Sequence, residues 1–512
     1  MASTIYSFNI SGVDGYVVEV ETDLIHGLPS VSIVGLGDAA VKEAKERLVS
    51  AITAAGYDFP LFKLVINLAP SDMKKRGTHF DLAMAIGILT RTDQIRVTQD
   101  CIKLFGFIGE LSLNAEIRPS SGVLPMVIKA KSEGIRHLIV PKENVKEALL
   151  VEGINIYSAN NLQEVVDLLE GNRSLLPEKK SRQPKQTTSH INLDFSDVKG
   201  HEQLLKYITV AAAGNHNLLL SGPPGCGKSM IAKRIPSVLP KMTEAEALEV
   251  TKIYSVANLL KNKGNLIIDR PFRSPHHSIS QYALIGGSQH ATPGEVSLSH
   301  NGVLFLDEIA EFNRKTLDSL RQPLEDHEVT IARVSNTNTY PSNFMLVAAM
   351  NPCPCGYHGT DKCRCTDYEI HRYRQKLSGP ILDRIDIQKH VTSVNFFEEN
   401  YSKINSSQIR EQVEKAKEIQ QKRYEDYPDI NYNAGLTPAL IKKYCELESE
   451  NEQLIKEAYN RFRYSARTLH KFLKVARTFA DLDGSKNIRR IDLVNSLMSR
   501  DIDKEQRDFL VI

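Results

Sequence analysis

One eight-residue stretch constrains the fold most strongly, Gly222-Pro223-Pro224-Gly225-Cys226-Gly227-Lys228-Ser229. It matches the pattern G-x-x-x-x-G-K-[ST], follows the apolar run Leu218–Leu220 and precedes a stretch of helical character. The glycines let backbone N–H groups surround phosphate oxygens, and the start of the helix adds positive dipole. Lys228 is expected to reach the β- and γ-phosphates of ATP, and the Ser229 hydroxyl to ligate Mg²⁺. The segment predicts a nucleotide site between a strand and a helix.

Two further apolar runs end in polar residues suited to the same site. Gly302–Leu306 is followed by Asp307 and Glu308. Asp307 is expected to complete the Mg²⁺ shell, and Glu308 to face a water near the γ-phosphate, which is the arrangement for hydrolysis. Phe344–Met350 ends in Asn351, which is placed to orient that water; a loop-capping asparagine is the plain alternative. Continuous apolar strands of this kind predict a parallel sheet covered on both faces.

The chain has 512 residues, which at roughly 150 per domain predicts about three domains. Between Gly171 and His190, five basic residues and one acid lie among prolines and small polar side chains. This composition cannot bury a core and predicts a linker. We therefore expect a mixed α/β domain over 1–170, the linker over 171–190, a parallel α/β core over 191–395 and a helical region over 396–512.

The spacing of apolar residues predicts the individual elements. Strands are also expected at Phe62–Leu68, His137–Pro141, Ile154–Ser158 and Asn215–Ser221. Helices are expected at Ala39–Ala55, His79–Thr90, Leu124–Glu133, Lys142–Val151, Asn161–Glu170, Ser407–Tyr424, Pro438–Leu447, Glu450–Tyr464, Ala466–Ala480 and Arg490–Arg500.

Composition narrows the class of protein without naming a partner. Lys and Arg total 64 against 62 Asp and Glu, which excludes a histone-like polycation and an acidic disordered chain. No run approaches the ~18–20 apolar residues of a membrane span, and the N-terminus lacks the pattern of a secretion signal. We expect a soluble, cytoplasmic protein.

Four of the seven cysteines lie within thirteen residues, as C-x-C, seven intervening residues and C-x-C. These are Cys353, Cys355, Cys363 and Cys365. In a reducing compartment such a cluster favours a thiolate metal site, and four thiolates suit a closed, structural Zn²⁺. The C-x-C spacing is tighter than is usual for zinc, so free thiols or a redox cluster remain the alternative.

With these strand ends in place, the chain resembles the AAA+ ATPases. The resemblance puts Asn351 in the sensor-1 position. It implies that Arg384, in Gly379-Pro380-Ile381-Leu382-Asp383-Arg384-Ile385-Asp386, is the arginine finger donated to a neighbouring subunit. It also implies that Arg467, in Ser465-Ala466-Arg467, is the sensor-2 arginine that couples the nucleotide to the lid. A finger acting in trans implies a homo-oligomer, by resemblance a hexameric ring.

Within AAA+ proteins, the residues between Lys228 and Asp307 are similar to the magnesium-chelatase motor family. They include the runs R-P-F-R-S-P-H-H from Arg270 and P-G-E-V-S-L-S-H-N-G from Pro293. Adjacent histidines on an extended segment face opposite ways, so a metal at His276-His277 is not expected. The closer resemblance is to the YifB/ComM type of these ATPases. It rests on the first domain, the cysteine segment and the lid run Ser465–Leu482, which together cover almost the whole chain.

The first domain resembles the C-terminal domain of Lon protease through the runs S-V-S-I-V-G-L from Ser30 and N-L-A-P-S-D-M-K-K from Asn67. In Lon the nucleophilic serine follows a Gly-Pro pair, whereas here the serine position holds His79. The stretch supplies no Ser-Lys pair for acyl transfer. We expect a docking or assembly module rather than a protease.

The family resemblance implies a ring motor on single-stranded or branched DNA, a helicase or branch-migration factor of recombination or natural transformation. Basic side chains could track a nucleic-acid backbone, although a solvated basic helix face is equally expected. They are Arg461, Arg463, Arg467, Lys471, Lys474, Arg477, Lys486, Arg489 and Arg490, with Lys362, Arg364, Arg372, Arg374, Lys376 and the aromatic Tyr373.

A hairpin around Val329–Arg333 is implied to line the pore of the ring, with Arg333 touching substrate. Two other functions stay open at this point. One is a motor subunit for metal insertion into a porphyrin, although that motor lacks a Lon-like domain and a cysteine quartet. The other is a protein-remodelling ATPase.

Overall fold

The computed structural model describes residues 2–172, 176–179, 193–198, 200–260, 265–287, 291–333, 336–392, 404–462 and 464–502. It divides into two compact units. Unit 1 comprises Met1–Gln186, Ala247–Ile267 and Thr330–Tyr340; unit 2 comprises Thr187–Glu246, Ile268–Val329 and Pro341–Ile512. Most of the expected linker lies outside the described residues. At its start the Glu178 amide donates to the carbonyl of Ile156 (2.8 Å).

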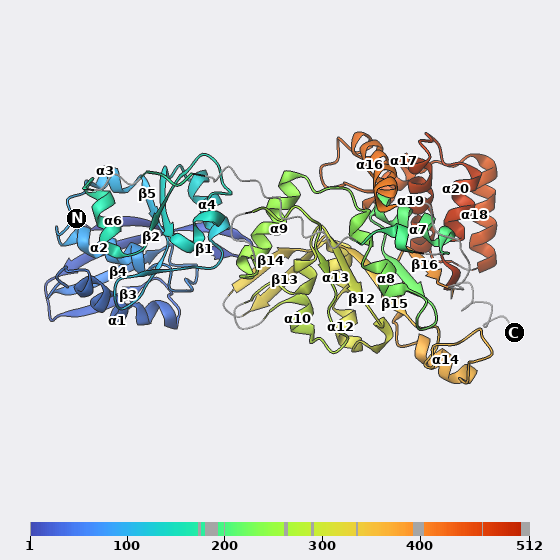
Figure 1. The fold of residues 1–512 in the computed structure, drawn as a ribbon, viewed down its shortest axis with the longest axis horizontal. Helices are drawn as coiled ribbons and strands as arrows, with labels where there is room; N and C mark the ends of the chain where they lie inside the picture. Colours follow the sequence, from blue (N-terminus) through green and yellow to red (C-terminus); the bar gives the residue numbers. More distant parts are fainter. Residues whose placement is uncertain are drawn as a thin grey trace. The chain divides into compact units, whose positions relative to one another are not determined.

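Unit 1 contains a seven-stranded mixed sheet in the order β3-β4-β2-β1-β5-β8-β9 (Figure 1). The strands are β1 (Ser3–Ser11), β2 (Asp14–Ile25), β3 (Ser30–Val34), β4 (Lys63–Ala69), β5 (Phe105–Phe107), β8 (His137–Pro141) and β9 (Asn155–Ala159). β2 pairs antiparallel with β1 and β4, and the other neighbours are parallel. This architecture confirms the mixed α/β expectation. The long β1–β2 hairpin was not predicted.

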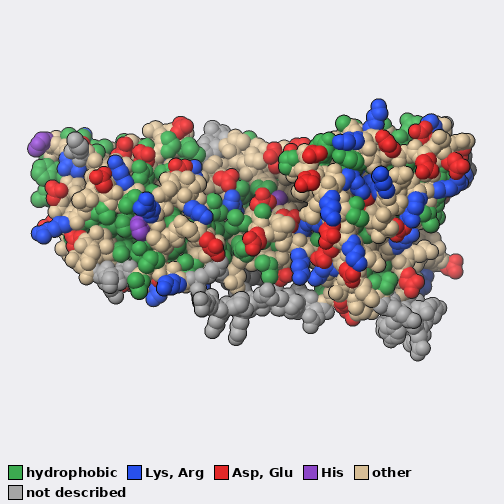
Figure 2. Space-filling model, turned by 90° about the horizontal axis from the view of Figure 1, so that it is seen from above, with side chains coloured by type: hydrophobic (Ala, Val, Ile, Leu, Met, Phe, Trp, Pro, Cys, Tyr) green, Lys and Arg blue, Asp and Glu red, His purple; other side chains and the backbone are tan. Residues whose placement is uncertain are grey.

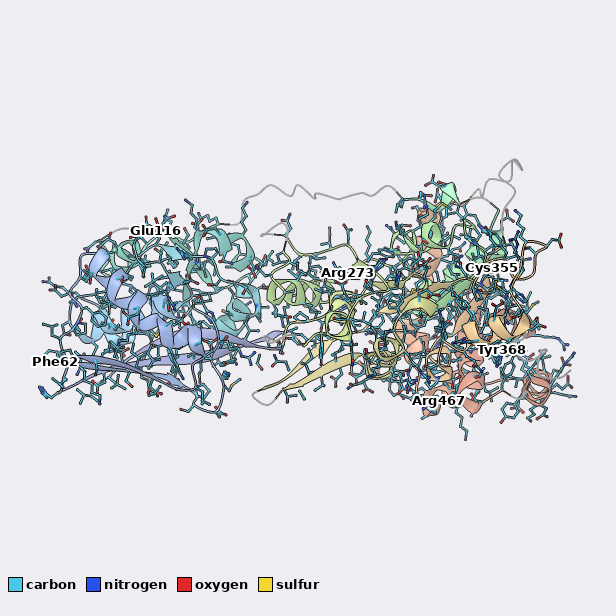
Figure 3. All side chains as sticks on the ribbon, turned by 90° about the horizontal axis from the view of Figure 1, so that it is seen from below. Phe62, Glu116, Arg273, Cys355, Tyr368 and Arg467 are labelled. Atoms are coloured by element: carbon cyan, nitrogen blue, oxygen red, sulfur yellow. The ribbon has the colours of Figure 1, made fainter. Side chains whose placement is uncertain are left out.

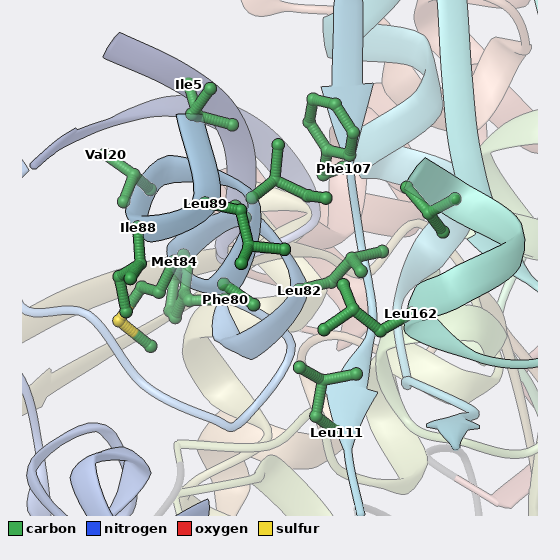
Figure 4. Packing of buried hydrophobic residues seen from close by; sticks show 14 of the residues in the cluster. Ile5, Val20, Phe80, Leu82, Met84, Ile88, Leu89, Phe107, Leu111 and Leu162 are labelled. Atoms are coloured by element: carbon green, nitrogen blue, oxygen red, sulfur yellow. The ribbon is translucent and has the colours of Figure 1, made fainter. Parts of the chain in front are cut away.

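The helices of this unit lie close to the expected ranges, except that the helix expected at Lys142–Val151 forms only over Val145–Ala148 and the helix at Gln99–Ile102 was not predicted. They are α1 (Ala39–Ala54), α2 (Asp81–Arg91), α3 (Gln99–Ile102), α4 (Val123–Ser132), α5 (Val145–Ala148) and α6 (Leu162–Leu169). All residues of α2 from Asp81 to Thr90 are buried. Figure 4 shows its side chains Leu82, Met84 and Leu89 among those of Ile5 and Val20 from the sheet. The unit also has the small hairpin β6 (Glu110–Leu111) and β7 (Ile117–Arg118) and most of α9 (Glu244–Val256). A second hairpin, β13 (Glu328–Arg333) and β14 (Asn336–Pro341), forms where one was expected.

Unit 2 is built on a five-stranded, fully parallel sheet in the order β11-β12-β15-β10-β16. The strands are β10 (Leu218–Ser221), β11 (Phe272–Arg273), β12 (Val303–Leu306), β15 (Met345–Met350) and β16 (Ile387–His390). β10, β12 and β15 are buried along their whole lengths, as their continuous apolar sequences predict. Because the strands are parallel, the polar residues that follow β10, β12 and β15 meet at one edge of the sheet.

Unit 2 also contains eight α-helices that precede the lid in the sequence of the described residues. They are α7 (Glu202–Gly214), α8 (Lys228–Ala232), α10 (Gln281–Ile285), α11 (Glu295–Leu298), α12 (Arg314–Asp318), α13 (Arg321–Asp326), α14 (Asp367–Arg374) and α15 (Gly379–Leu382). The C-terminal lid adds α16 (Ser406–Arg423), α17 (Pro438–Tyr444), α18 (Ser449–Phe462), α19 (Ala466–Leu482) and α20 (Arg490–Leu497). One core joins residues of the sheet, α7, α16 and α19. Among the described residues, no helix combines the length and the apolar character needed to span a membrane.

Candidate active site

The glycine-rich loop connects β10 to α8 at the carboxyl edge of the parallel sheet. Gly225 and Gly227 have φ values of +79° and +90°, which non-glycine residues rarely adopt. The Lys228 ammonium folds back over the loop and donates to the carbonyls of Gly222 (2.6 Å) and Pro223 (2.9 Å). It also donates to Oδ1 of Asn351 (3.3 Å). A cation held at the mouth of a glycine loop suits the β- and γ-phosphates of a nucleotide.

The residues expected to bind Mg²⁺ come together from two strands. The Ser229 hydroxyl donates to Oδ2 of Asp307 over 2.6 Å. A hydroxyl and a carboxylate at this distance can share one hard cation that keeps water and phosphate oxygens as its other ligands, so the pair fits Mg²⁺. When bound, Mg²⁺ would neutralise charge on the phosphates.

Glu308 follows Asp307 in a left-handed conformation with φ of +50°, and its amide donates to Oδ1 of Asp307 (3.0 Å). Its side chain remains 57% exposed, so the carboxylate can reach a water beyond the phosphates. Asn351 directly follows β15 and accepts a hydrogen bond from Lys228. The structure therefore gathers Lys228, Ser229, Asp307 and Asn351 at one edge, with Glu308 beside them.

A histidine also lies near Glu308, which the sequence reasoning missed. Nδ1 of His277 is 3.8 Å from a carboxylate oxygen of Glu308. The expectation that His276 and His277 face opposite ways was wrong: their rings are 4.0 Å apart, because the chain turns there instead of continuing as a strand. The order of the strands could have predicted this contact. His277 follows β11 and Glu308 follows β12, and because these two strands are parallel neighbours, the segments after them lie at the same edge of the sheet.

Arg384 and Arg467 meet at the opposite edge of the sheet. Glu325 binds both, at 2.7 Å from Arg384 and 3.7 Å from Arg467. The Arg384 carbonyl accepts from the side chain of Asn217, which precedes β10. β10 has four residues and separates this edge from the glycine loop by about 13 Å. The two arginines, with Glu325, line a cleft of about 370 Å³. Glu325 belongs to no sequence motif, so its contact with the two arginines could be found only from the structure.

A buried ion pair fixes the lid to the sheet beside this cleft. Lys471 of α19 donates to Oδ1 of Asp386, before β16, over 2.7 Å. The amide of Asn217 donates to Oδ2 of Asp386 (3.1 Å), and Nδ1 of His216 lies 3.6 Å from it. Burial alone would raise the pKa of Asp386, but Lys471 and His216 hold it well below its usual value.

Removing one partner of this pair is expected to destabilise the protein. Asp386→Asn or Lys471→Met alone leaves the other buried charge unpaired and should cost about 3–5 kcal/mol, whereas the two substitutions together should cost much less. Urea unfolding of the four proteins measures this. Because the pKa of Asp386 is depressed, the wild-type contribution is complete above its ordinary value of 3.8 and is lost as the pH falls below it. Equal losses for the single and double variants would contradict the coupling.

The four cysteines of the expected metal site come together. Their sulfur atoms all lie within 4.8 Å of one another, and all four are free thiols. The backbone N–H groups of Arg364 and Tyr357 donate to Cys355 and lower its pKa to about 6. The expected ligand set is therefore assembled without a disulfide.

Several basic side chains of the run in the lid are engaged in contacts within the protein. Arg477 is 2% exposed and binds Asp481 and the carbonyls of Ser485 and Lys486. Lys471 binds Asp386, and Arg489 pairs with Asp483 and Asp492. Helix packing therefore uses the charges of Lys471 and Arg477, whereas Arg461, Arg467, Lys486, Arg489 and Arg490 are exposed, and a nucleic-acid contact at these residues stays a prediction. Arg463 and the side chain of Arg333 lie outside what the structure describes.

The basic side chains between Lys362 and Arg372 are more exposed to solvent than those of Lys471 and Arg477 in the lid. Lys362, Arg364 and Arg372 are exposed. Tyr373, the expected aromatic partner, is only 5% exposed, whereas Tyr368 on the same helix is 72% exposed. Figure 3 labels Cys355 and Tyr368 on this unit. On the face seen in Figure 2, Lys and Arg side chains are interspersed with those of Asp and Glu.

The Lon-like part of unit 1 has a buried histidine at the serine position. His79 is 8% exposed, and its Nε2 lies 2.9 Å from the carbonyl of Phe8. Burial lowers its pKa to about 4, so the ring is neutral. Lys75 is fully buried and donates to the Pro70 carbonyl. Neither group is arranged as a nucleophile with its base.

A parallel sheet with the glycine loop, the Asp-Glu strand and the polar strand end defines a P-loop ATPase of the AAA+ class. Family models for magnesium chelatase subunit ChlI match residues 194–399, its C-terminal region matches 403–500, and a further ChlI model matches 20–144. Competence protein ComM of Haemophilus influenzae is 40% identical over 96% of both chains, and YifB of Escherichia coli 39% over 96% of both. Lon protease 2 of Bacillus subtilis is 26% identical over 29% of this chain. The chain belongs to the ComM/YifB family of magnesium-chelatase-like AAA+ ATPases.

Proposed function

We propose that this ATPase is a homo-oligomeric ring motor that acts on single-stranded or branched DNA. The observation that carries the proposal is the exposed surface formed by Lys362, Arg364, Arg372 and Tyr368 next to the ATPase strand end. Basic side chains bind phosphates without reading sequence, and an exposed aromatic ring stacks on unpaired bases. A relative that covers nearly the full chain bears the name competence protein.

The placement of the arginines supports assembly into a ring, which we take to be hexameric. Arg384 and Arg467 lie at the edge of the sheet away from the chain's own glycine loop, so each is better placed for the nucleotide of a neighbouring subunit. In a head-to-tail ring, every subunit presents this edge to the next glycine loop. Both arginines form ion pairs with Glu325 here. The more highly charged phosphates of a bound nucleotide would compete with Glu325 for them.

Within such a site the chain's own groups have distinct tasks. Lys228 binds phosphate oxygens, Ser229 and Asp307 hold the cation, and Glu308 accepts a proton from the attacking water. Asn351 fixes the orientation of that water. Arg384 stabilises charge that develops on the phosphate during hydrolysis.

The test is DNA binding and DNA-stimulated ATP hydrolysis by the full chain. The variant Lys362→Ala/Arg364→Ala/Arg372→Ala should weaken binding to a single-stranded oligonucleotide about tenfold or more and flatten its salt dependence. Lys415→Ala/Lys422→Ala/Lys456→Ala removes the same charge from exposed lid helices and should bind normally. Tyr368→Ala should weaken binding to single-stranded DNA more than binding to duplex DNA, because only unpaired bases can stack on the ring.

The alternatives predict other outcomes. If neither single-stranded nor branched DNA bound the wild-type protein or changed its ATPase rate, the DNA proposal would fail. Mg²⁺ insertion into protoporphyrin in the presence of chelatase partner subunits would then favour a chelatase motor. ATPase stimulation by an unfolded protein would favour a remodelling activity.

A further inference from the structure

The four cysteines have the spacing of a tetrahedral thiolate site. Sulfur–sulfur separations are 3.4 Å for Cys353–Cys355, 3.9 Å for Cys353–Cys363 and 3.8 Å for Cys355–Cys363. Four sulfurs bound at about 2.3 Å to a tetrahedral Zn²⁺ lie about 3.8 Å apart. Disulfide sulfurs would lie about 2.05 Å apart. A set of four thiolates selects a soft or borderline cation over Mg²⁺.

Tight turns in the backbone bring the two C-x-C pairs together. The Gly356 amide donates to the Cys353 carbonyl, and the Cys363 amide donates to the Thr360 carbonyl, both over 3.0 Å. The His358 amide donates to the Cys353 sulfur over 3.2 Å. N–H donation to a sulfur stabilises its thiolate, the form that binds metal. Cys353 is fully buried, Cys363 and Cys365 are partly buried and Cys355 is exposed, so Cys353 anchors one side of the cluster in the domain.

The cysteine loop, residues 353–365, contacts the nucleotide site at one glycine. Gly356 has φ of +86°, and a Cβ on it would lie 2.8 Å from Cδ of Pro224 in the glycine-rich loop. The same Cβ would lie 3.9 Å from Cγ of Asn351. Asn351 in turn accepts from Lys228 over 3.3 Å. The cysteine loop therefore packs directly on two of the segments that surround the nucleotide.

We propose that Cys353, Cys355, Cys363 and Cys365 bind one Zn²⁺, and that this closed loop braces the glycine-rich loop through Gly356, so that nucleotide binding depends on the metal. Structural zinc supplies folding free energy to a short loop that has little core of its own. With the metal removed, Gly356 loses its fixed position against Pro224. The inference needs only the ATP site and does not depend on a DNA substrate.

Metal content and nucleotide affinity test the proposal on the full chain. Elemental analysis of tag-free wild-type protein should find one zinc per chain, and Cys355→Ser or Cys363→Ser should lose it. Chelator-treated protein and both variants should bind a fluorescent ATP analogue about fivefold or more weakly, the lower end of measured coupling between sites. Circular dichroism should show that the rest of the fold persists. Wild-type protein without zinc, or metal-free protein with unchanged affinity, would overturn the proposal.

Two glycines of the cysteine loop, Gly356 and Gly359, allow a controlled test of the contact with Pro224. Gly359 has φ of +84°, nearly the same as Gly356, but no atom lies within 4 Å of the Cβ it would carry. Gly356→Ala and Gly359→Ala therefore introduce the same backbone strain. Both should retain zinc, and only Gly356→Ala should bind the ATP analogue more weakly. Equal affinity of the two variants would refute the contact with Pro224.

Discussion

Glu308→Gln is expected to lower the ATP hydrolysis rate by about 10²- to 10⁴-fold, the contribution of a well-placed general base. The change keeps the size of the side chain but removes its ability to accept a proton from water. Glu308 is 57% exposed and receives no contact from Lys228 or Ser229 in the structure. Nucleotide binding should therefore be retained, and a fluorescent ATP analogue should bind Glu308→Gln as tightly as the wild type.

Lys228→Ala is the contrasting variant for this experiment. Lys228 donates to the loop carbonyls and to Asn351, so its loss should weaken nucleotide binding as well as hydrolysis. Steady-state phosphate release and equilibrium binding, measured on the same preparations, separate the two effects. A Glu308→Gln protein that turns over ATP at the wild-type rate would refute the role of the carboxylate as base.

The nucleotide site could be foreseen because its residues follow directly from strand ends. β12 and β15 are continuous apolar runs that end at Asp307 and Asn351, and the three leucines of β10 lead into the glycine-rich loop with Lys228 and Ser229. Parallel pairing then forces those groups to one edge. Contacts such as Glu325 with Arg384 and His277 with Glu308 join segments that no local pattern connects, so they required the fold.

In the basic segments, the sequence analysis did not establish which side of each helix faces solvent. On α14 the sequence favoured Tyr373 as the exposed aromatic residue, but the helix turns Tyr368 outward instead. Thr366 and Glu369 form a capping box that sets where α14 begins, and this signal could have given the phase. On α19, Arg477 and Asp481 are four residues apart, a spacing that indicates pairing within the helix rather than a free cation.

Arg384→Ala is expected to lower ATP hydrolysis by about 10³-fold, as loss of an arginine finger does in other phosphoryl-transfer enzymes. Arg384 is 13% exposed and is held by Glu325, by the Pro380 carbonyl (2.8 Å) and by the Arg321 carbonyl (3.2 Å). This support keeps its guanidinium at the edge of the sheet away from Lys228. If a neighbour receives it, a subunit with Arg384→Ala and a subunit with Lys228→Ala lack different halves of the shared site.

Mixing the two inactive variants therefore tests the arrangement. In an equal mixture of head-to-tail rings, about a quarter of the interfaces combine an intact glycine loop with an intact Arg384, and hydrolysis should recover to about that fraction of the wild-type rate. Arg467→Ala, which is 70% exposed and makes a longer contact with Glu325, should lose less activity than Arg384→Ala. A mixture as inactive as its components would contradict sites completed independently by the neighbouring subunit.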